Sequence, residues 1–450
     1  MNRKKIAWLL VVVMLCSALC GCGENQKRDD KESAQPVNYD NLMEQWSQQV
    51  DVESDVLTCW YTDEADKAWL ESSAKKFEKE YAAKVNLVYY DGISLFEDMN
   101  QANQKEEGPD LYLLGNDQLQ IATQSGLAEE LSWLQEEYFL ETYSEVARKA
   151  TNYQGKQYGY PLYFDTYCLV YDANLLETAP ASIEDIITFL DAYEDTGSTK
   201  AVFRWDVADP YINSMFLGSY ANLFGENGDE PESFTINNEQ CIATMEYFQS
   251  LSAYLWMDKD NISHDTVMNR IKDGTLVLGL CKSDMLPDLY TMQEESVSTT
   301  EQDVAGEASG EATEAEMDNV QTTNYQISYV PSLTAELSST SFSTTYSAFV
   351  NPYGKNNVLA NMFGLYLSIS CGENQFETSG KLPVVEPKDG LDDVKKVVYA
   401  QYRNSKPVPK VVVLGDYLTE SAIAFDAIWE GNDVTEQLNQ LQQTMEEKIQ

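Results

Sequence analysis

Residues 158–171, YGYPLYFDTYCLVY, limit the possible folds more than any other part of the chain. Aromatic and β-branched residues dominate this stretch, and Pro161 is incompatible with a helix interior, so we expect it to be extended. With a period of two, Asp165 shares a face with Tyr163 and Tyr167. A carboxylate in a largely apolar strand needs water or a polar partner. The pattern alone allows a solvated Asp165 or a carboxylate beside tyrosine rings in a binding cleft.

The segment before this stretch alternates β-type runs with helical runs. We expect strands at 56–61, 85–90 and 109–114 and helices at 64–81 and 94–104. This alternation indicates an α/β fold with a largely parallel sheet. Ligands of such sheets bind beyond the carboxyl ends of the strands, which selects the loops at 62–66 and 115–118.

Length and composition restrict the architecture and the ligand. A chain of 450 residues is too long for one core, so we expect two lobes. The formal net charge of −44 argues against a nucleic-acid-binding surface but suits neutral sugars or cations. With His264 as the single histidine and no CxxC pair after Cys22, we expect buried free thiols, no metal site and no cofactor.

The N-terminus has the pattern of a lipoprotein signal peptide. Three basic residues precede an apolar run at 6–15, which is too short to span a membrane. Leu19, Cys20 and Gly21 then lead to Cys22, so we expect cleavage after residue 21 and lipidation of Cys22. A plain membrane anchor is the alternative. Residues 22–50 are polar, and we expect them to form a flexible tether.

The segment GKQYGYPLYFDTYCLVYDANLLE resembles the crossover segment of the maltose-binding-protein-like family 1 of bacterial extracellular solute-binding proteins. This resemblance implies a two-lobe, type II periplasmic-binding-protein-like fold with discontinuous lobes. Lobe 1 would comprise 51–165 and 346–395, and lobe 2 would comprise 166–345 and 396–450. The hinge would lie at 163–168 and 343–348. The acidic, low-complexity stretch 294–320 would be a disordered insertion that the resemblance does not cover.

The same resemblance implies a set of ligand-binding residues. GPDLYLLGND places the family's loop acid at Asp117 beside Asn116, and the acid-Pro-Tyr triplet matches Asp209, Pro210 and Tyr211. The other residues that we expect at the cleft are Glu64, Tyr163, Asp165, Arg204, Asp284, Tyr346 and Tyr417. The sequence departs from the family at Leu114 and Asp284, where relatives have tryptophans that stack on sugar rings.

The function that follows is the solute-binding component of an ABC importer, anchored by lipid outside the cytoplasmic membrane. We expect a monomer that binds an oligosaccharide between its lobes and contacts membrane permease subunits. Two alternatives stay open: a binding protein for polyamines or other cations, because acids and tyrosines can hold a cation, and a sensory or adhesive lipoprotein. We do not expect an enzyme, because the acids are explained by hydroxyl recognition.

Overall fold

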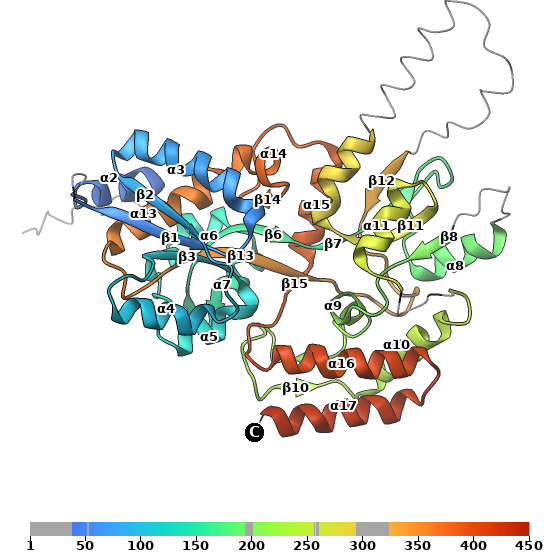
Figure 1. Cartoon of the computed structure of the whole chain (residues 1–450). Coiled ribbons are helices and arrows are strands. Elements are labelled where there is room, and N and C mark those ends of the chain that lie inside the picture. The colour runs from blue at the N-terminus through green and yellow to red at the C-terminus, as the bar shows by residue number, and fades with distance from the viewer. Residues whose placement is uncertain are drawn as a thin grey trace, which may run out of the picture. The chain divides into compact units, whose positions relative to one another are not determined.

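The computed structural model describes residues 38–51, 54–193, 201–255, 257, 261–293 and 324–449. Residues 39–450 belong to one compact unit. Its described residues form two larger β-sheets with covering helices (Figure 1) and two small two-stranded sheets. The predicted signal peptide, Cys22 and the insertion 294–320 lie outside the described residues. None of the described helices is long and apolar enough to cross a membrane.

Lobe 1 is built on a mixed sheet with the strand order β14-β6-β13-β3-β1-β2. Its strands are β1 (Val56–Tyr61), β2 (Lys84–Tyr89), β3 (Leu111–Gly115), β6 (Tyr160–Asp165), β13 (Phe342–Val350) and β14 (Leu382–Pro383), and β15 (Lys406–Pro407) also pairs with β13. Strands β1, β2 and β3 are parallel, as predicted, whereas β13 inserts antiparallel between β3 and β6. The late strand β13 therefore completes the sheet that the N-terminal segment begins.

Among the described residues, eight α-helices belong to lobe 1. Figure 1 shows α2 and α3 on one side of the sheet and α4 and α5 on the other. They are α2 (Tyr39–Ser47), α3 (Lys67–Tyr81), α4 (Leu95–Gln104), α5 (Leu119–Gln124), α6 (Glu137–Thr142), α7 (Glu145–Thr151), α13 (Asn357–Ser370) and α14 (Gln375–Ser379). The hairpin of β4 (Asn152–Tyr153) and β5 (Lys156–Gln157) turns at Gln154 and Gly155. Both turn residues have positive φ, which glycine adopts without strain.

Lobe 2 contains a four-stranded sheet with the order β12-β7-β11-β8. Its strands are β7 (Tyr167–Asp172), β8 (Ala201–Arg204), β11 (Leu276–Lys282) and β12 (Tyr325–Ser328), and a small ribbon pairs β9 (Asn222–Leu223) with β10 (Phe234–Thr235). Its helices are α8 (Ile183–Ala192), α9 (Pro210–Asn213), α10 (Glu239–Leu251), α11 (His264–Lys272), α16 (Leu414–Trp429) and α17 (Val434–Ile449). Trp205, Phe248 and Phe425 lie in its aromatic core.

The chain passes between the lobes three times. Strand β6 becomes β7 at Thr166, the segment before β13 returns to lobe 1, and α15 (Asp393–Asn404) with β15 leads back to α16. Thr166 is buried, and its main-chain oxygen accepts a bond of 2.8 Å from the Ser283 N–H, while its Oγ1 accepts one of 2.8 Å from Ser343 Oγ. The first two crossings are therefore bonded to each other beside the cleft.

Two expectations need correction. Residues 39–47 do not continue the flexible tether, because they form α2, which packs on α13 with Met43 only 2% exposed. Tyr417, which was expected at the cleft, instead lies on the buried face of α16 together with Ile428, whereas Leu418 is only half-buried. The expectation of buried free thiols is confirmed for Cys59, Cys168, Cys241, Cys281 and Cys371.

Candidate functional site

A cavity of about 170 Å³ lies between the lobes, next to the crossings. Lobe 1 and the crossings supply an acidic and aromatic wall, and lobe 2 supplies two tyrosines and a lysine. The lining residues are Asp117, Asp165, Thr166, Tyr167, Tyr211, Lys282, Phe342, Thr344, Tyr346 and Val408. Four of the residues that we expected at the cleft, Asp117, Asp165, Tyr211 and Tyr346, are thus brought together from positions far apart in the sequence.

Asp165 ends β6 at the point where the chain leaves lobe 1. Its partner in the adjacent strand is Thr344, which also lines the cavity. Burial and the nearby charge of Asp284 raise the pKa of Asp165 to about 6, against the opposing effect of Lys381 and Lys282. The carboxylate is therefore poorly stabilised in the ligand-free protein.

Asp117 stands in the short helix η2 (Asn116–Gln118), directly after β3. Its Oδ2 accepts a hydrogen bond of 2.9 Å from Gln118, and burial raises its pKa. The side chain folds back over Gly115, where an added Cβ would lie 2.5 Å from Asp117 Oδ1. Glycine at this position lets the carboxylate reach the cavity beyond the carboxyl end of β3, where α/β sheets place ligands.

The wall of lobe 2 is organised by Asp209, which caps α9. Its carboxylate accepts hydrogen bonds from the Tyr211 N–H at 2.9 Å and from Tyr167 Oη at 3.0 Å. Two rings of the cavity wall are thereby fixed by one acid that does not itself line the cavity. Lys282 Nζ lies 5.8 Å from the centre of the Tyr167 ring, within cation–π range.

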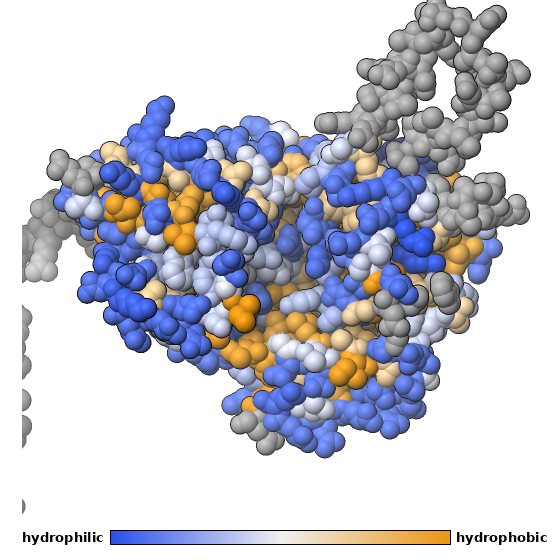
Figure 2. All heavy atoms as spheres, in the orientation of Figure 1, coloured by the Kyte–Doolittle hydropathy of each residue, from blue (hydrophilic) through white to orange (hydrophobic). Residues whose placement is uncertain are grey.

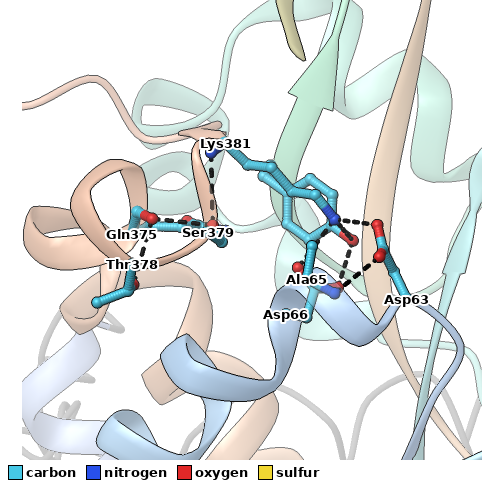
Figure 3. A network of polar contacts seen from close by, with 8 residues as sticks. Asp63, Ala65, Asp66, Gln375, Thr378, Ser379 and Lys381 are labelled. Atoms are coloured by element: carbon cyan, nitrogen blue, oxygen red, sulfur yellow. Dashed lines mark hydrogen bonds and ion pairs between the residues drawn. The ribbon is translucent and has the colours of Figure 1, made fainter. Parts of the chain in front are cut away.

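A charged network supports Tyr346 from behind. The Tyr346 ring stacks on Tyr163 at a centroid distance of 4.7 Å, and Tyr163 Oη donates a bond of 2.6 Å to Asp66. Lys381 Nζ lies 4.4 Å from the centre of the Tyr163 ring and pairs with Asp66 at 3.0 Å and with Asp63. Figure 3 shows Lys381 extending toward these two aspartates.

The ion pairs of this network are partly buried. Burial lowers the pKa of Lys381, but Asp66 and Asp63 outweigh it, so the net pKa is raised. For Asp63 the ion pair outweighs burial and lowers the pKa, whereas for the fully buried Asp66 burial prevails and raises it. Lys381 therefore stays charged beneath the Tyr163 and Tyr346 rings.

The other expected site residues do not line the cavity. Tyr417 is 2% exposed and packs against Phe224 and Phe234, because the buried face of α16 is rotated toward it. Asn116 is fully buried and bridges two crossings, donating to Val408 O and accepting from the Thr345 N–H, both at 2.8 Å.

The remaining polar residues lie outside the lining. Arg204 donates to the Phe203 carbonyl, Glu64 is exposed in η1 (Glu64–Asp66), and Asp284 pairs with His264 at 3.2 Å. Leu114, which stands where the family has a tryptophan, is buried in the core of lobe 1 and does not line the cavity.

Several residues of this site were not expected from the sequence. Lys282, Phe342 and Val408 line the cavity, and Lys381 supports it. Tyr167 could have been predicted, because the period of two in the strand places it on the same face as Asp165. Lys381 has no such signal, because its aspartate partners are more than 300 positions away in the chain.

Comparisons with known proteins agree with this architecture. Residues 72–342 match the family model of bacterial extracellular solute-binding proteins. The galactooligosaccharide-binding protein of Bacillus subtilis is 22% identical over 461 residues, which cover 99% of this chain and 98% of that protein. A maltooligosaccharide ABC transporter solute-binding lipoprotein of Streptococcus pneumoniae is 26% identical over 205 residues, so the chain spans about half (46%) of that relative's length.

Solved structures show the same fold. The extracellular solute-binding protein from Staphylococcus aureus in complex with maltose has a TM-score of 0.72 and 19% identity, and the match covers 88% of this chain and 97% of that one. A cyclo/maltodextrin-binding protein complexed with maltotetraose has a TM-score of 0.70 and 18% identity, with coverage of 88% and 97%. The predicted two-lobe α/β fold is thereby confirmed.

Proposed function

Since this chain belongs to the family of bacterial extracellular solute-binding proteins, we propose that it is the solute-binding component of an ABC importer and that it binds an oligosaccharide between its lobes. The observation that carries this proposal is the interlobe cavity, in which tyrosine rings face carboxylates. Rings pack on the apolar faces of sugars, and carboxylates accept strong hydrogen bonds from hydroxyl groups. The relatives named for galactooligosaccharides and maltooligosaccharides support a carbohydrate ligand.

The size of the cavity bears on how the ligand enters. Its volume of about 170 Å³ is below the roughly 300–1,000 Å³ of common ligand pockets. We propose that the lobes rotate apart about the crossings at Thr166 and Ser343 to admit an oligosaccharide and close on it. The domain boundaries expected above, 51–165 with 346–395 and 166–345 with 396–450, belong to this proposal.

Binding without catalysis is part of the same proposal. The family consists of binding proteins, and the cavity lining, taken over the described residues, contains no histidine, cysteine or serine. We therefore assign Asp165 and Asp117 to hydrogen bonding of hydroxyl groups.

The protein acts outside the cytoplasm, as its family does. We propose that Cys22 carries the lipid anchor that holds it beside its permease, because two acyl chains give stable membrane attachment. Changing Cys22 to Ser should abolish the incorporation of radiolabelled fatty acid into the protein in growing cells. Labelling of the Cys22→Ser protein at the level of the wild type would contradict the lipid anchor at Cys22.

A thermal-shift screen of the purified full-length protein against galacto-oligosaccharides, malto-oligosaccharides and oligosaccharides of amino sugars tests the function. A ligand at 100 times its Kd stabilises the folded state by about 2.7 kcal/mol, which raises the melting temperature measurably. Stabilisation by at least one oligosaccharide supports the proposal. No shift with any neutral or amino carbohydrate would move the assignment to a sensory or adhesive lipoprotein.

A further inference from the structure

Negative charge dominates the surroundings of the cavity. Asp117 and Asp165 line it. Five more aspartates contact its lining residues or act on their charge: Asp63, Asp66, Asp206, Asp209 and Asp284. The cations among the described neighbours are two lysines. Lys381 is held by Asp63 and Asp66. Lys282 lines the cavity, and among the described residues no carboxylate lies within ion-pair distance of it.

Asp165 is the group that this imbalance affects most. The described residues donate no hydrogen bond to its carboxylate, although burial and Asp284 both disfavour its charge. A neutral hydroxyl donor stabilises the charged Asp165 carboxylate only in part, because it brings no positive charge. An ammonium group donates three hydrogen bonds and cancels the charge.

The aromatic wall fits the same ligand group. The negative charges of Asp165 and Asp117 both act on the Tyr346 hydroxyl and add to the burial that raises its pKa, so this ring lies near both acids. Tyr167 and Tyr211 complete the wall from lobe 2. A cation over a tyrosine ring gains cation–π attraction, most of all where water is excluded.

We infer that the ligand carries a protonated amine, which binds between Asp165 and Asp117 against the Tyr346 ring. The inference rests on the proposed function and narrows the ligand class to amino sugars. The same chemistry occurs in free polyamines, which the test separates from amino sugars.

Calorimetric titration with matched disaccharides tests the inference on the full-length protein. Cellobiose, chitobiose and diacetylchitobiose share one skeleton and linkage and carry a hydroxyl, an amine and an acetamide at carbon 2. We expect chitobiose to bind at least about tenfold more tightly than the other two, which corresponds to one charge-assisted hydrogen bond. The preference should fall with added salt, since ion pairs are screened.

Two variants locate the amine. Asp165→Asn keeps the shape of the side chain and should remove the tenfold preference. Glu71→Gln removes an exposed carboxylate on α3 and should preserve it. If Asp165→Asn fails to fold, the salt dependence of the wild type still decides, because a preference for chitobiose that does not weaken with added salt overturns the inference.

The outcomes separate this inference from the proposed function. If cellobiose or diacetylchitobiose binds as tightly as chitobiose or more tightly, the inference of a protonated amine is wrong, and the proposed carbohydrate function stands. If spermidine binds and none of the disaccharides does, the protonated amine is supported, and the proposal of a carbohydrate ligand is wrong. Failure of both chitobiose and spermidine to bind overturns the inference.

Discussion

Asp165 shows how a residue of the proposed binding site can lower the stability of the ligand-free protein. Its pKa of about 6 exceeds the ordinary value of 3.8, so the folded protein holds a proton that the unfolded chain releases between these values. Stability therefore falls as the pH rises through this window. The cost of the charged form is at most about 3 kcal/mol above pH 6.

Asp165→Asn should consequently raise the melting temperature of the ligand-free protein at pH 7.5 by a few degrees. The gain should shrink at pH 5, because wild-type Asp165 is then largely protonated in the folded state. Differential scanning calorimetry at both pH values measures it. A variant that is less stable than the wild type at pH 7.5 would show that Asp165 is well solvated or paired.

Lys381 is the opposite case, because its charge stabilises the folded protein. Asp66 is 1% exposed, so Lys381→Met would leave a buried carboxylate without its cation. Losing one partner of a buried pair costs about 3–5 kcal/mol, which urea denaturation would measure. Adding Asp66→Asn should recover part of the loss. No recovery in the double variant would mean that Lys381 stabilises the protein chiefly by packing on Tyr163.

The sequence predicted single residues unevenly. Asp165 stands in the crossover segment and Tyr211 in the acid-Pro-Tyr triplet, so both could be aligned with the family. The structure places both at the cavity. Tyr417 was expected there because the family resemblance implies a stacking aromatic at the start of this helix. The direction of such a side chain changes by about 100° per residue along the helix, and in α16 Tyr417 points into the core. The Lys381 network depends on β14 lying beside β6, which no local pattern encodes.

Helix α2 is the element whose role was least expected. Residues 38–50 are polar overall, yet Met43 is buried and α2 packs on α13. The composition did not predict this docked helix, because only three apolar residues, Leu42, Met43 and Trp46, form the apolar face of an amphipathic helix here. By contrast, β1 to β3 and their helices were predictable, since strand and helix periods alternate clearly there.

Met43→Asp should detach α2 from lobe 1, because a carboxylate would be buried without a partner. We expect protease cleavage within residues 38–50 at concentrations that leave the wild type intact. Gln45→Asp, on the exposed side of α2, is the matched control. Equal protease resistance of Met43→Asp and the wild type would mean that α2 contributes no stable docking.

At the scale of the whole molecule, two lobes share three chain crossings and enclose one acidic, tyrosine-lined cavity. Length and the crossover motif predicted the lobes. The size of the cavity was not predictable, because it depends on how closely the lobes approach. The negative charge of the chain was visible in its composition, but the concentration of aspartates around the cavity appeared only in the fold.

The most direct test of the central claim is a calorimetric titration of the best carbohydrate ligand into wild-type, Tyr211→Ala and Tyr353→Ala proteins. Tyr211 lines the cavity, whereas Tyr353 is an exposed tyrosine, 62% accessible, outside its lining. We expect Tyr211→Ala to weaken binding about tenfold or more and Tyr353→Ala to bind like the wild type. Normal binding by Tyr211→Ala would show that the ligand site lies elsewhere.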